Sequence, residues 1–303
     1  MFIRDLKYVS AKDFLNSLLN WNNDFSKYVF RGHSKEEYKL IPNSLRKENL
    51  QSLFEMANLG SYAKEPNDTE NAIMDYEHSI LRRFYKSSDM SGLVVPTSNE
   101  LRNNLVQDHG SFLDFPTSHP FIEWLPESLW EIAALAQHYG LPTRLLDWTY
   151  DPFVAAYFAS RPSISSDVEG NMVIWGLNRE AIGIIKMLDL DGLPLDFVTP
   201  HYSSNSNINA QKGLFTHFST NINYRDPIIQ ERKSLDEILE KCINPEWYKT
   251  RDIFVRIVIP NHMAREVFSL LNDFGYNSAR LFPGYGGVVK QMNDLVKCEK
   301  MNQ

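Results

Sequence analysis

The chain has 303 residues, of which 43% are apolar and 13% are Phe, Tyr or Trp. This length and apolar content suit one large domain over residues 1–303 with a sizeable core, and they exclude intrinsic disorder as the overall state. The net charge of −7, from 31 basic and 38 acidic residues, comes without a polybasic run and disfavours a protein that follows a nucleic-acid backbone.

The sequence carries no signal for a membrane or for an oxidising compartment. It has no run of about 18 apolar residues that would span a bilayer, and its first residues lack the apolar core of a signal peptide. Only two cysteines, Cys242 and Cys298, are present, and they are too few for a disulfide framework. We therefore expect a soluble, cytoplasmic protein with no membrane partner.

The first part of the chain is predicted to be mostly helical. Ser10 is placed to cap a helix whose apolar residues recur at helical spacing, namely Phe14, Leu15, Leu18 and Leu19. A short strand is expected over residues 28–32, with Arg31 emerging at a sheet edge or cleft. A second helix is expected over residues 68–85, with Glu77 beside its apolar stripe. Residues 86–128 are rich in Ser, Asn, Pro and Asp, which predicts an irregular insertion.

The middle of the chain alternates helix and strand. Residues 130–139 are predicted to form a helix that ends at Gly140, and residues 143–149 a strand. Asp151 and Pro152 then begin a short helix over residues 153–159, which is apolar on all sides and must be buried.

The remainder is predicted to be rich in strands. Strands are expected over residues 172–177, 214–218 and 253–259, and a helix over residues 262–273. Residues 196–212 are predicted as a loop, and residues 284–287 as a tight turn. Because helices precede most of the strands, the sequence predicts an α+β fold with an N-terminal helical part.

Several common catalytic motifs are absent. The chain has no G-x-S-x-G elbow, no P-loop and no C-x-x-C motif. Its eight histidines are scattered without the spacing of helical zinc ligands, so no metal is expected.

Two stretches are dense in side chains that do chemistry. One is Phe30-Arg31-Gly32-His33, continuing through Leu40-Ile-Pro42 to Arg46, and the other runs from Gln137 to Thr149. Together they resemble the FRG domain, a bacterial family named for a Phe/Tyr-Arg-Gly motif that stands here at residues 30–32. Residues 209–216 and 281–283 resemble two further motifs of that family, so the resemblance spans nearly the whole chain.

A more distant similarity concerns the ADP-ribosyltransferases. These enzymes carry three motifs in order: a strand that ends in aromatic-Arg-Gly, a strand followed by a helix that ends in Phe-Ala, and a late Gln/Glu-x-Glu motif. This chain has comparable segments at residues 30–32, 146–159 and 211–213. The resemblance implies an ADP-ribosyltransferase-like split-sheet core that grips NAD. The nucleotide-binding set that it implies is Phe30, Arg31, Gly32, His33, Gln137, Arg144, Trp148, Thr149 and Gln211.

The position that matches the catalytic Glu of those enzymes is Gly213. A carboxylate is needed there because cleavage of an N-glycosidic bond builds an oxocarbenium-like cation. Asp147 and Glu77 are the candidates to supply it, with Arg31 and His138 as the other candidate catalytic residues.

Each of these residues also has a structural interpretation. Arg144 and Asp147 can form a structural ion pair, and Gln137 and His138 can cap the end of their helix. Trp148 can belong to the core, Glu77 can be an ordinary solvated helix residue, and Gln211 with Gly213 can mark a bulge.

Three functions remain open. The first is an ADP-ribosyltransferase-like or NAD-cleaving enzyme, as in a bacterial toxin or anti-phage effector, with a protein or nucleic acid as the acceptor. The second is an inactive module whose cleft senses a nucleotide or dinucleotide. The third is a metal-independent nuclease that uses His33, His138 and Arg144.

Overall fold

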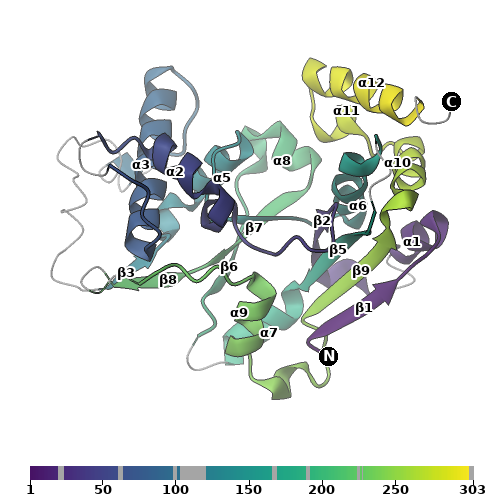
Figure 1. Ribbon diagram of the computed structural model, residues 1–303, viewed down its shortest axis with the longest axis horizontal. Helices are drawn as coiled ribbons and strands as arrows, with labels where there is room; N and C mark the ends of the chain where they lie inside the picture. Colours follow the sequence, from purple (N-terminus) through teal and green to yellow (C-terminus); the bar gives the residue numbers. More distant parts are fainter. Residues whose placement is uncertain are drawn as a thin grey trace.

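The computed structural model describes residues 1–19, 24–60, 64–97, 101–102, 121–165, 169–188, 192–223, 226 and 228–299. The fold is α+β, as predicted. Its centre is a seven-stranded sheet in the order β1-β9-β5-β2-β4-β7-β6 (Figure 1). A separate two-stranded sheet pairs β3 (Phe121–Trp124) with β8 (Thr220–Asn223).

The large sheet is built from two unequal parts. One part holds β1 (Ile3–Lys7), β9 (Phe254–Pro260), β5 (Asn171–Asn178) and β2 (Tyr28–His33). The other holds β4 (Leu146–Thr149), β7 (Gly213–Phe218) and β6 (Leu195–Val198). Only β1 and β9 run parallel; the other neighbouring strands are antiparallel.

The two parts meet at a single residue pair. Phe30 of β2 lies opposite Thr149 of β4, and these two strands share no other pair. By contrast, β2 matches β5 from Tyr28 to His33 without a break. The sheet therefore divides between β2 and β4.

Helices cover both faces of the first part of the sheet. On one face lie α1 (Ala11–Ser17), α6 (Pro152–Ser160) and α10 (Ala264–Asp273), in one core with Val255, Ile257 and Ile259 of β9. On the other face lie α7 (Arg179–Leu188) and α9 (Leu235–Cys242), in a core with Phe254 and Val258. The alternation along β9 follows the two-residue period of a strand, so this strand is buried on both sides.

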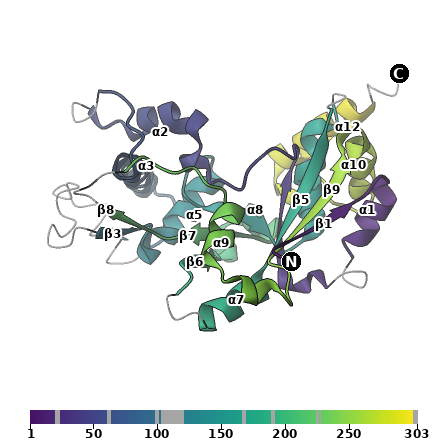
Figure 2. The same cartoon turned by 60° about the horizontal axis from the view of Figure 1, so that its bottom comes forward.

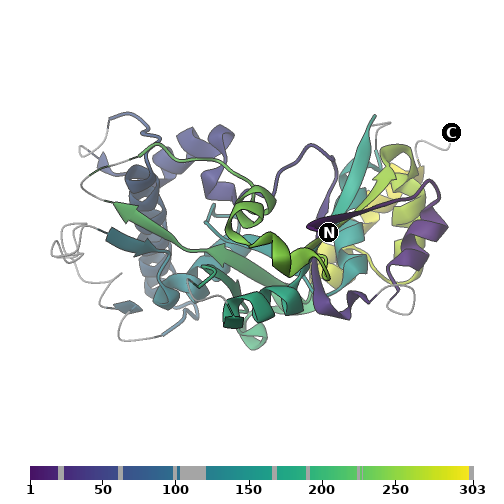
Figure 3. The same cartoon turned by 90° about the horizontal axis from the view of Figure 1, so that it is seen from below.

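The remaining helices lie towards the two ends of the molecule. At one end are α2 (Leu50–Ala57), α3 (Glu70–Met90) and the β3–β8 pair, next to α5 (Trp130–His138) (Figures 2 and 3). At the other end α11 (Ser278–Leu281) and α12 (Tyr285–Glu299) lie beside α10, whereas α8 (Ser206–Ala210) leads into β7. Within the described part of the chain, no helix is both long enough and apolar enough to cross a bilayer.

The capped helices confirm their predictions. Ser10 accepts a hydrogen bond from the backbone of Asp13 at the start of α1. Asp151 accepts one from Phe153 at the start of α6, whose first residue is Pro152. Gly140, with φ +92°, follows the end of α5 in the left-handed conformation that favours glycine. The strands predicted over residues 28–32, 172–177, 214–218 and 253–259 are β2, β5, β7 and β9.

Three predictions of irregular structure are wrong in part. In the segment 86–128, α3 continues to Met90 and β3 occupies Phe121–Trp124, while residues 98–100 and 103–120 lie outside the described residues. The segment 196–212 contains most of β6 and all of α8. Residues 284–287 are a turn only at Gly284, because α12 begins at Tyr285. The N-terminal part is also not purely helical, since it begins with β1.

Candidate functional site

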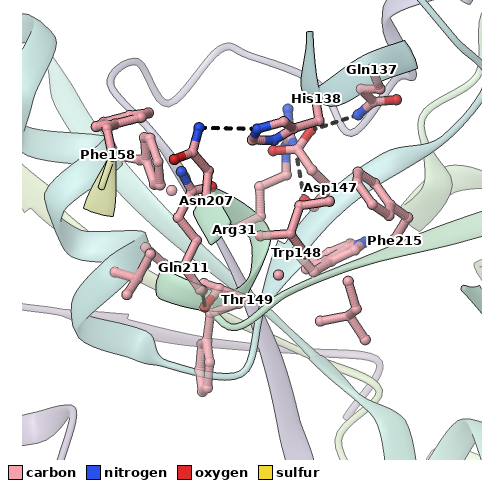
Figure 4. Close-up of a pocket in the computed structure, with 18 residues that line it drawn as sticks. Arg31, Gln137, His138, Asp147, Trp148, Thr149, Phe158, Asn207, Gln211 and Phe215 are labelled. Carbon is pink, nitrogen blue, oxygen red and sulfur yellow. Dashed lines mark hydrogen bonds and ion pairs between the residues drawn. The ribbon is translucent and has the colours of Figure 1, made fainter. Parts of the chain in front are cut away.

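A cavity of about 460 Å³ lies where β2 and β4 separate (Figure 4). Its walls come from both parts of the sheet and from α5, α6 and α8. The residues that line it are Phe30, Arg31, Gly32, Gln137, His138, Asp147, Trp148, Thr149, Val154, Ala155, Phe158, Asn207, Ile208, Gln211, Gly213, Leu214, Phe215 and Phe282. Most of the predicted site residues therefore converge here, although they lie far apart in the sequence.

Gly32 allows helix α6 to lie directly on β2. A Cβ atom on this residue would sit 1.9 Å from the carbonyl oxygen of Ala155 and 2.9 Å from the backbone nitrogen of Ala159. No side chain fits at that distance, so the glycine of the Phe-Arg-Gly motif serves close packing between a helix and a strand. Phe30 serves the same core, because its side chain is fully buried.

Arg31 and Asp147 form an ion pair across the division in the sheet. The Nη1 atom of Arg31 lies 2.5 Å from Oδ1 of Asp147 and donates to the Asp147 carbonyl oxygen at 2.8 Å. Gln137 donates from Nε2 to the same Oδ1 at 3.3 Å. The Asp147 side chain is 60% exposed and that of Arg31 only 14%, so the carboxylate is the accessible partner of the pair.

Arg31 keeps Asp147 ionised. Burial by the surrounding protein atoms raises the pKa of the Asp147 carboxyl group. The charge of Arg31 and its hydrogen bond lower this pKa by more than burial raises it, so the pKa lies below the ordinary value of 3.8. Asp147 therefore carries a full negative charge at neutral pH. Among the described residues that line the cavity, it is the one carboxylate.

His33 positions Arg31 and is not itself in the cavity wall. Its Nδ1 atom donates to the carbonyl oxygen of Tyr38 at 3.1 Å, and its Nε2 atom accepts from Nε of Arg31 at 2.8 Å. Burial, followed by the nearby charge of Arg31, lowers the pKa of His33 to about 3. The ring is thus a neutral acceptor that orients the guanidinium, and it cannot exchange protons at neutral pH.

The end of α5 contributes a second group of polar side chains. Thr143 donates a hydrogen bond to the Gln137 side-chain oxygen, which turns the amide nitrogen towards Asp147. His138 accepts through Nε2 from the amide of Asn207 at 3.0 Å, and burial lowers its pKa. Gln137 and His138 therefore face the cavity and do more than end a helix.

Thr149 fixes the far wall of the cavity. Its hydroxyl donates to the Gln211 carbonyl oxygen at 2.6 Å and accepts from the backbone N–H of Asp151 at 3.0 Å. The Gln211 amide in turn donates to the carbonyl oxygen of Leu281 at 3.0 Å. These bonds join β4, the end of α8 and the C-terminal helices, so Thr149 and Gln211 shape the cavity wall.

Trp148 belongs mainly to the core. Its side chain is 3% exposed, and its indole donates to the Thr216 hydroxyl at 2.9 Å. It is therefore not free to stack on a ligand. Phe158 and Phe282, which line the cavity and pack edge to face with their ring centres 6.1 Å apart, are the aromatic rings that can do so. Both rings belong to stretches that resemble family motifs, but their exposure to the cavity cannot be predicted from the sequence without the fold.

Glu77 and Arg144 lie elsewhere, contrary to their assignment to the catalytic and nucleotide-binding sets. Each side chain is 3% exposed, and Nε of Arg144 lies 3.0 Å from Oε2 of Glu77. Glu77 also accepts from Ser44 and, at 2.5 Å, from the indole of Trp124. Arg144 thus pairs with Glu77 and not with Asp147, and this buried pair joins α3 to the segment before β4.

Gly213, which matches the catalytic Glu of the ADP-ribosyltransferases, lies in the cavity wall opposite Thr149. A Cβ atom there would lie 3.3 Å from the side chain of Ile208, which is tight but not prohibitive. The site therefore lacks a carboxylate at this point of the wall and holds Asp147 on the neighbouring strand instead.

Residues 112–167 match the family model described as the FRG domain. This match contains the stretch from Gln137 to Thr149 and helix α6, and it supports the assignment to that family over well under half of the chain. Neither the comparison with curated proteins nor that with solved structures returned a significant match. Over the part of the chain that is described, no three His, Cys, Asp or Glu side chains gather closely enough to hold a metal ion.

Proposed function

We propose that this pocket binds NAD and that the protein is an ADP-ribosyltransferase-like or NAD-cleaving enzyme. The observation that carries the proposal is the ionised carboxylate of Asp147, held by Arg31 in the wall of a 460 Å³ cavity. Cavities of about 300–1,000 Å³ with a few convergent polar groups are typical of small-molecule sites.

The chemistry assigned to Asp147 follows from its charge and its exposure. As the bond between ribose and nicotinamide breaks, positive charge develops on the ribose ring, and a fixed carboxylate stabilises that charge. Arg31 binds the ligand's phosphates or ribose hydroxyls, and Phe158 or Phe282 stacks on a planar ring. With water as the acceptor the product is ADP-ribose; with a protein or nucleic-acid nucleophile the reaction is a transfer. A toxin or anti-phage role belongs to this proposal by fold-level analogy.

A specific contact favours one alternative, a nucleotide sensor without turnover. The Oδ1 atom of Asp147 already accepts from both Arg31 and Gln137. A carboxylate so engaged stabilises less charge on a substrate. The nuclease hypothesis has less support, because Arg144 is paired with Glu77 and both ring nitrogens of His33 are already hydrogen-bonded to protein groups, Arg31 and Tyr38.

The proposal is tested by incubating the protein with NAD and measuring both binding by calorimetry and nicotinamide release by chromatography. We expect Asp147→Asn to reduce release by roughly 100-fold or more while NAD still binds, and Arg31→Ala to weaken binding. Asp273→Asn, which removes an exposed carboxylate on α10, is the matched control. Binding by the wild type without release would favour the sensor, and absence of both would refute the proposal.

A further inference from the structure

A second, smaller cavity adjoins the first. It has a volume of about 240 Å³, and it shares Arg31, Gln137 and Asp147 with the larger cavity. Its remaining lining residues are Asn43, Arg46, Gly140, Leu141, Leu145 and Leu146. We name this space the annex. Because the Arg31–Asp147 pair borders both spaces, one ligand can touch that pair from the main cavity and continue into the annex.

The annex holds more positive than negative charge. Arg31 and Arg46 both line it, whereas Asp147 is the one carboxylate among its described lining residues. Asp147 is paired with Arg31. Arg46 donates from Nε to the carbonyl oxygen of Ile41 at 3.2 Å, and no carboxylate within the described residues lies at ion-pair distance from it. Two carboxylates, those of the exposed Glu48 and of Asp147, act on Arg46 only through space.

The charge of Arg46 is only partly compensated by these carboxylates. Burial lowers its pKa, and the neighbouring charge of Arg31 lowers it further. Leu141, Leu145 and Leu146 form an apolar part of the annex wall, beside the polar side chains of Asn43, Gln137 and Asp147. An anion between the two guanidinium groups would relieve their repulsion.

Three carbonyl groups at the helix end beside the annex are engaged within the chain and do not face a ligand as free acceptors. Three carbonyl oxygens in the last turn of α5, those of Leu135, Ala136 and Gln137, accept from the backbone N–H groups of Tyr139, Leu141 and Gly140. The turn after α5 thereby closes on itself. The side-chain donors that the annex offers to a ligand are chiefly the Arg46 guanidinium and the Asn43 amide, and the Asp147 carboxylate is the acceptor beside them.

We infer that the annex binds the diphosphate of a nucleotide whose remaining parts occupy the main cavity, and that Arg46 is a phosphate-binding residue. A guanidinium group binds two oxygen atoms of a phosphate through two parallel hydrogen bonds. A lysine ammonium group cannot form this bidentate contact, so an arginine at position 46 suits a phosphate site better than a lysine would. Arg31 contacts the ligand from between the two spaces. The inference rests on the proposed function only in taking the ligand to be a nucleotide, and it does not require turnover.

The test compares ADP-ribose with adenosine, which lacks the phosphates, by calorimetry. We expect the wild type to prefer ADP-ribose, and Arg46→Gln to weaken ADP-ribose binding by about 10- to 100-fold without changing adenosine binding. Arg46→Lys should lose less, because it keeps the charge. Lys47→Gln removes the same charge from the next, exposed residue and should change neither affinity. Near-ultraviolet circular dichroism checks that each variant is folded.

Three results would overturn the inference: no preference of the wild type for ADP-ribose, unchanged ADP-ribose binding in Arg46→Gln, or equal losses for both ligands in that variant. Its failure is distinct from that of the proposed function. If ADP-ribose binding depends on Arg46 but no nicotinamide is released from NAD, the inference about the annex is supported and the proposed NAD cleavage is refuted. If the protein cleaves NAD and Arg46→Gln binds ADP-ribose as tightly as the wild type does, the proposed enzymatic function is supported and the inference about the annex is refuted.

Discussion

Asp147 and Glu77 differ in exposure more than in chemistry. The Asp147 side chain is 60% exposed beside the cavity, whereas that of Glu77 is 3% exposed and accepts hydrogen bonds from Ser44, Trp124 and Arg144. A carboxylate that is satisfied from three sides by protein donors has little capacity left for a ligand. Of the two carboxylates considered from the sequence, Asp147 is therefore the one that can meet a substrate.

Replacing Glu77 tests its structural role. In Glu77→Ala the Arg144 guanidinium remains buried without its partner, so we expect the free energy of unfolding to fall by about 3–5 kcal/mol. Urea denaturation measures this value. Glu55→Ala, on the exposed face of α2, should change it by less than about 0.5 kcal/mol. A loss below about 1 kcal/mol in Glu77→Ala would contradict the role assigned to the pair.

Local motifs in the sequence predict several residues that line the cavity but not the contacts that these residues make. Arg31, Gln137, Asp147 and Thr149 were all predicted, because two local motifs contain them. Which carboxylate Arg144 meets depends on where α3 packs, and no local pattern in residues 137–149 encodes that. The exposure of Phe158 likewise depends on the division between β2 and β4, which is a property of the assembled sheet.

At the scale of elements, the contact between β2 and α6 determines the shape of the cavity. Helix α6 is almost wholly apolar and lies on the sheet beside the division, with Val154, Ala155 and Phe158 in the cavity wall. Its distance from β2 is set by the absence of a side chain at Gly32. Any residue larger than glycine would push the helix away and widen the gap next to Arg31.

Two glycine-to-alanine variants separate this steric effect from the general effect of the substitution. Gly32→Ala places a Cβ 1.9 Å from the Ala155 carbonyl oxygen, so we expect it to lower the free energy of unfolding by about 3 kcal/mol or more. Gly183→Ala, within α7, meets nothing within 4 Å and should raise it by up to about 1 kcal/mol. Chemical denaturation of both variants and of the wild type measures these changes in the free energy of unfolding. Equal effects would show that close packing at Gly32 is unimportant.

The elements predicted well are those with strong local signals. The capped helices α1 and α6 and the apolar strand β9 needed no information from distant residues. The missed strand β1 carries Arg4, Asp5 and Lys7, and charged residues suit an edge strand that has only one neighbour. Two short elements were missed for different reasons: β6 has only four residues, and α8 consists mostly of polar residues, so tertiary contacts decide their structure more than propensity does.

At the scale of the whole molecule, three buried histidines make stability depend on pH. Burial lowers the pKa of His33 to about 3, and that of His78 and His217 to about 4, from 6.5. The unfolded chain therefore binds protons below pH 6.5 that the native protein does not. Linkage then requires stability to fall as the pH drops from about 6.5 towards 4, by about 1.4 kcal/mol per pH unit for each histidine.

Removing one of these histidines should reduce that slope. The free energy of unfolding is measured with urea at several pH values between about 5 and 6. As the pH is lowered, it should fall less steeply in His217→Gln than in the wild type, with a slope smaller by roughly 1 kcal/mol per pH unit. His262→Gln, at an exposed position, should keep the wild-type slope. An unchanged slope in His217→Gln would mean that this ring is protonated in the native state.

The pairing of β1 with β9 joins residues at opposite ends of the sequence: Asp5 and Arg256, which form an ion pair at 2.7 Å, are 251 positions apart. On a chain emerging from the ribosome, β4, β7 and β6 can associate once residue 218 has appeared, but β9 has to wait until residue 260 is made. Phe282 follows later still. We therefore expect the cavity to be completed only after residue 282 has emerged, well after β4, β7 and β6 have paired with one another.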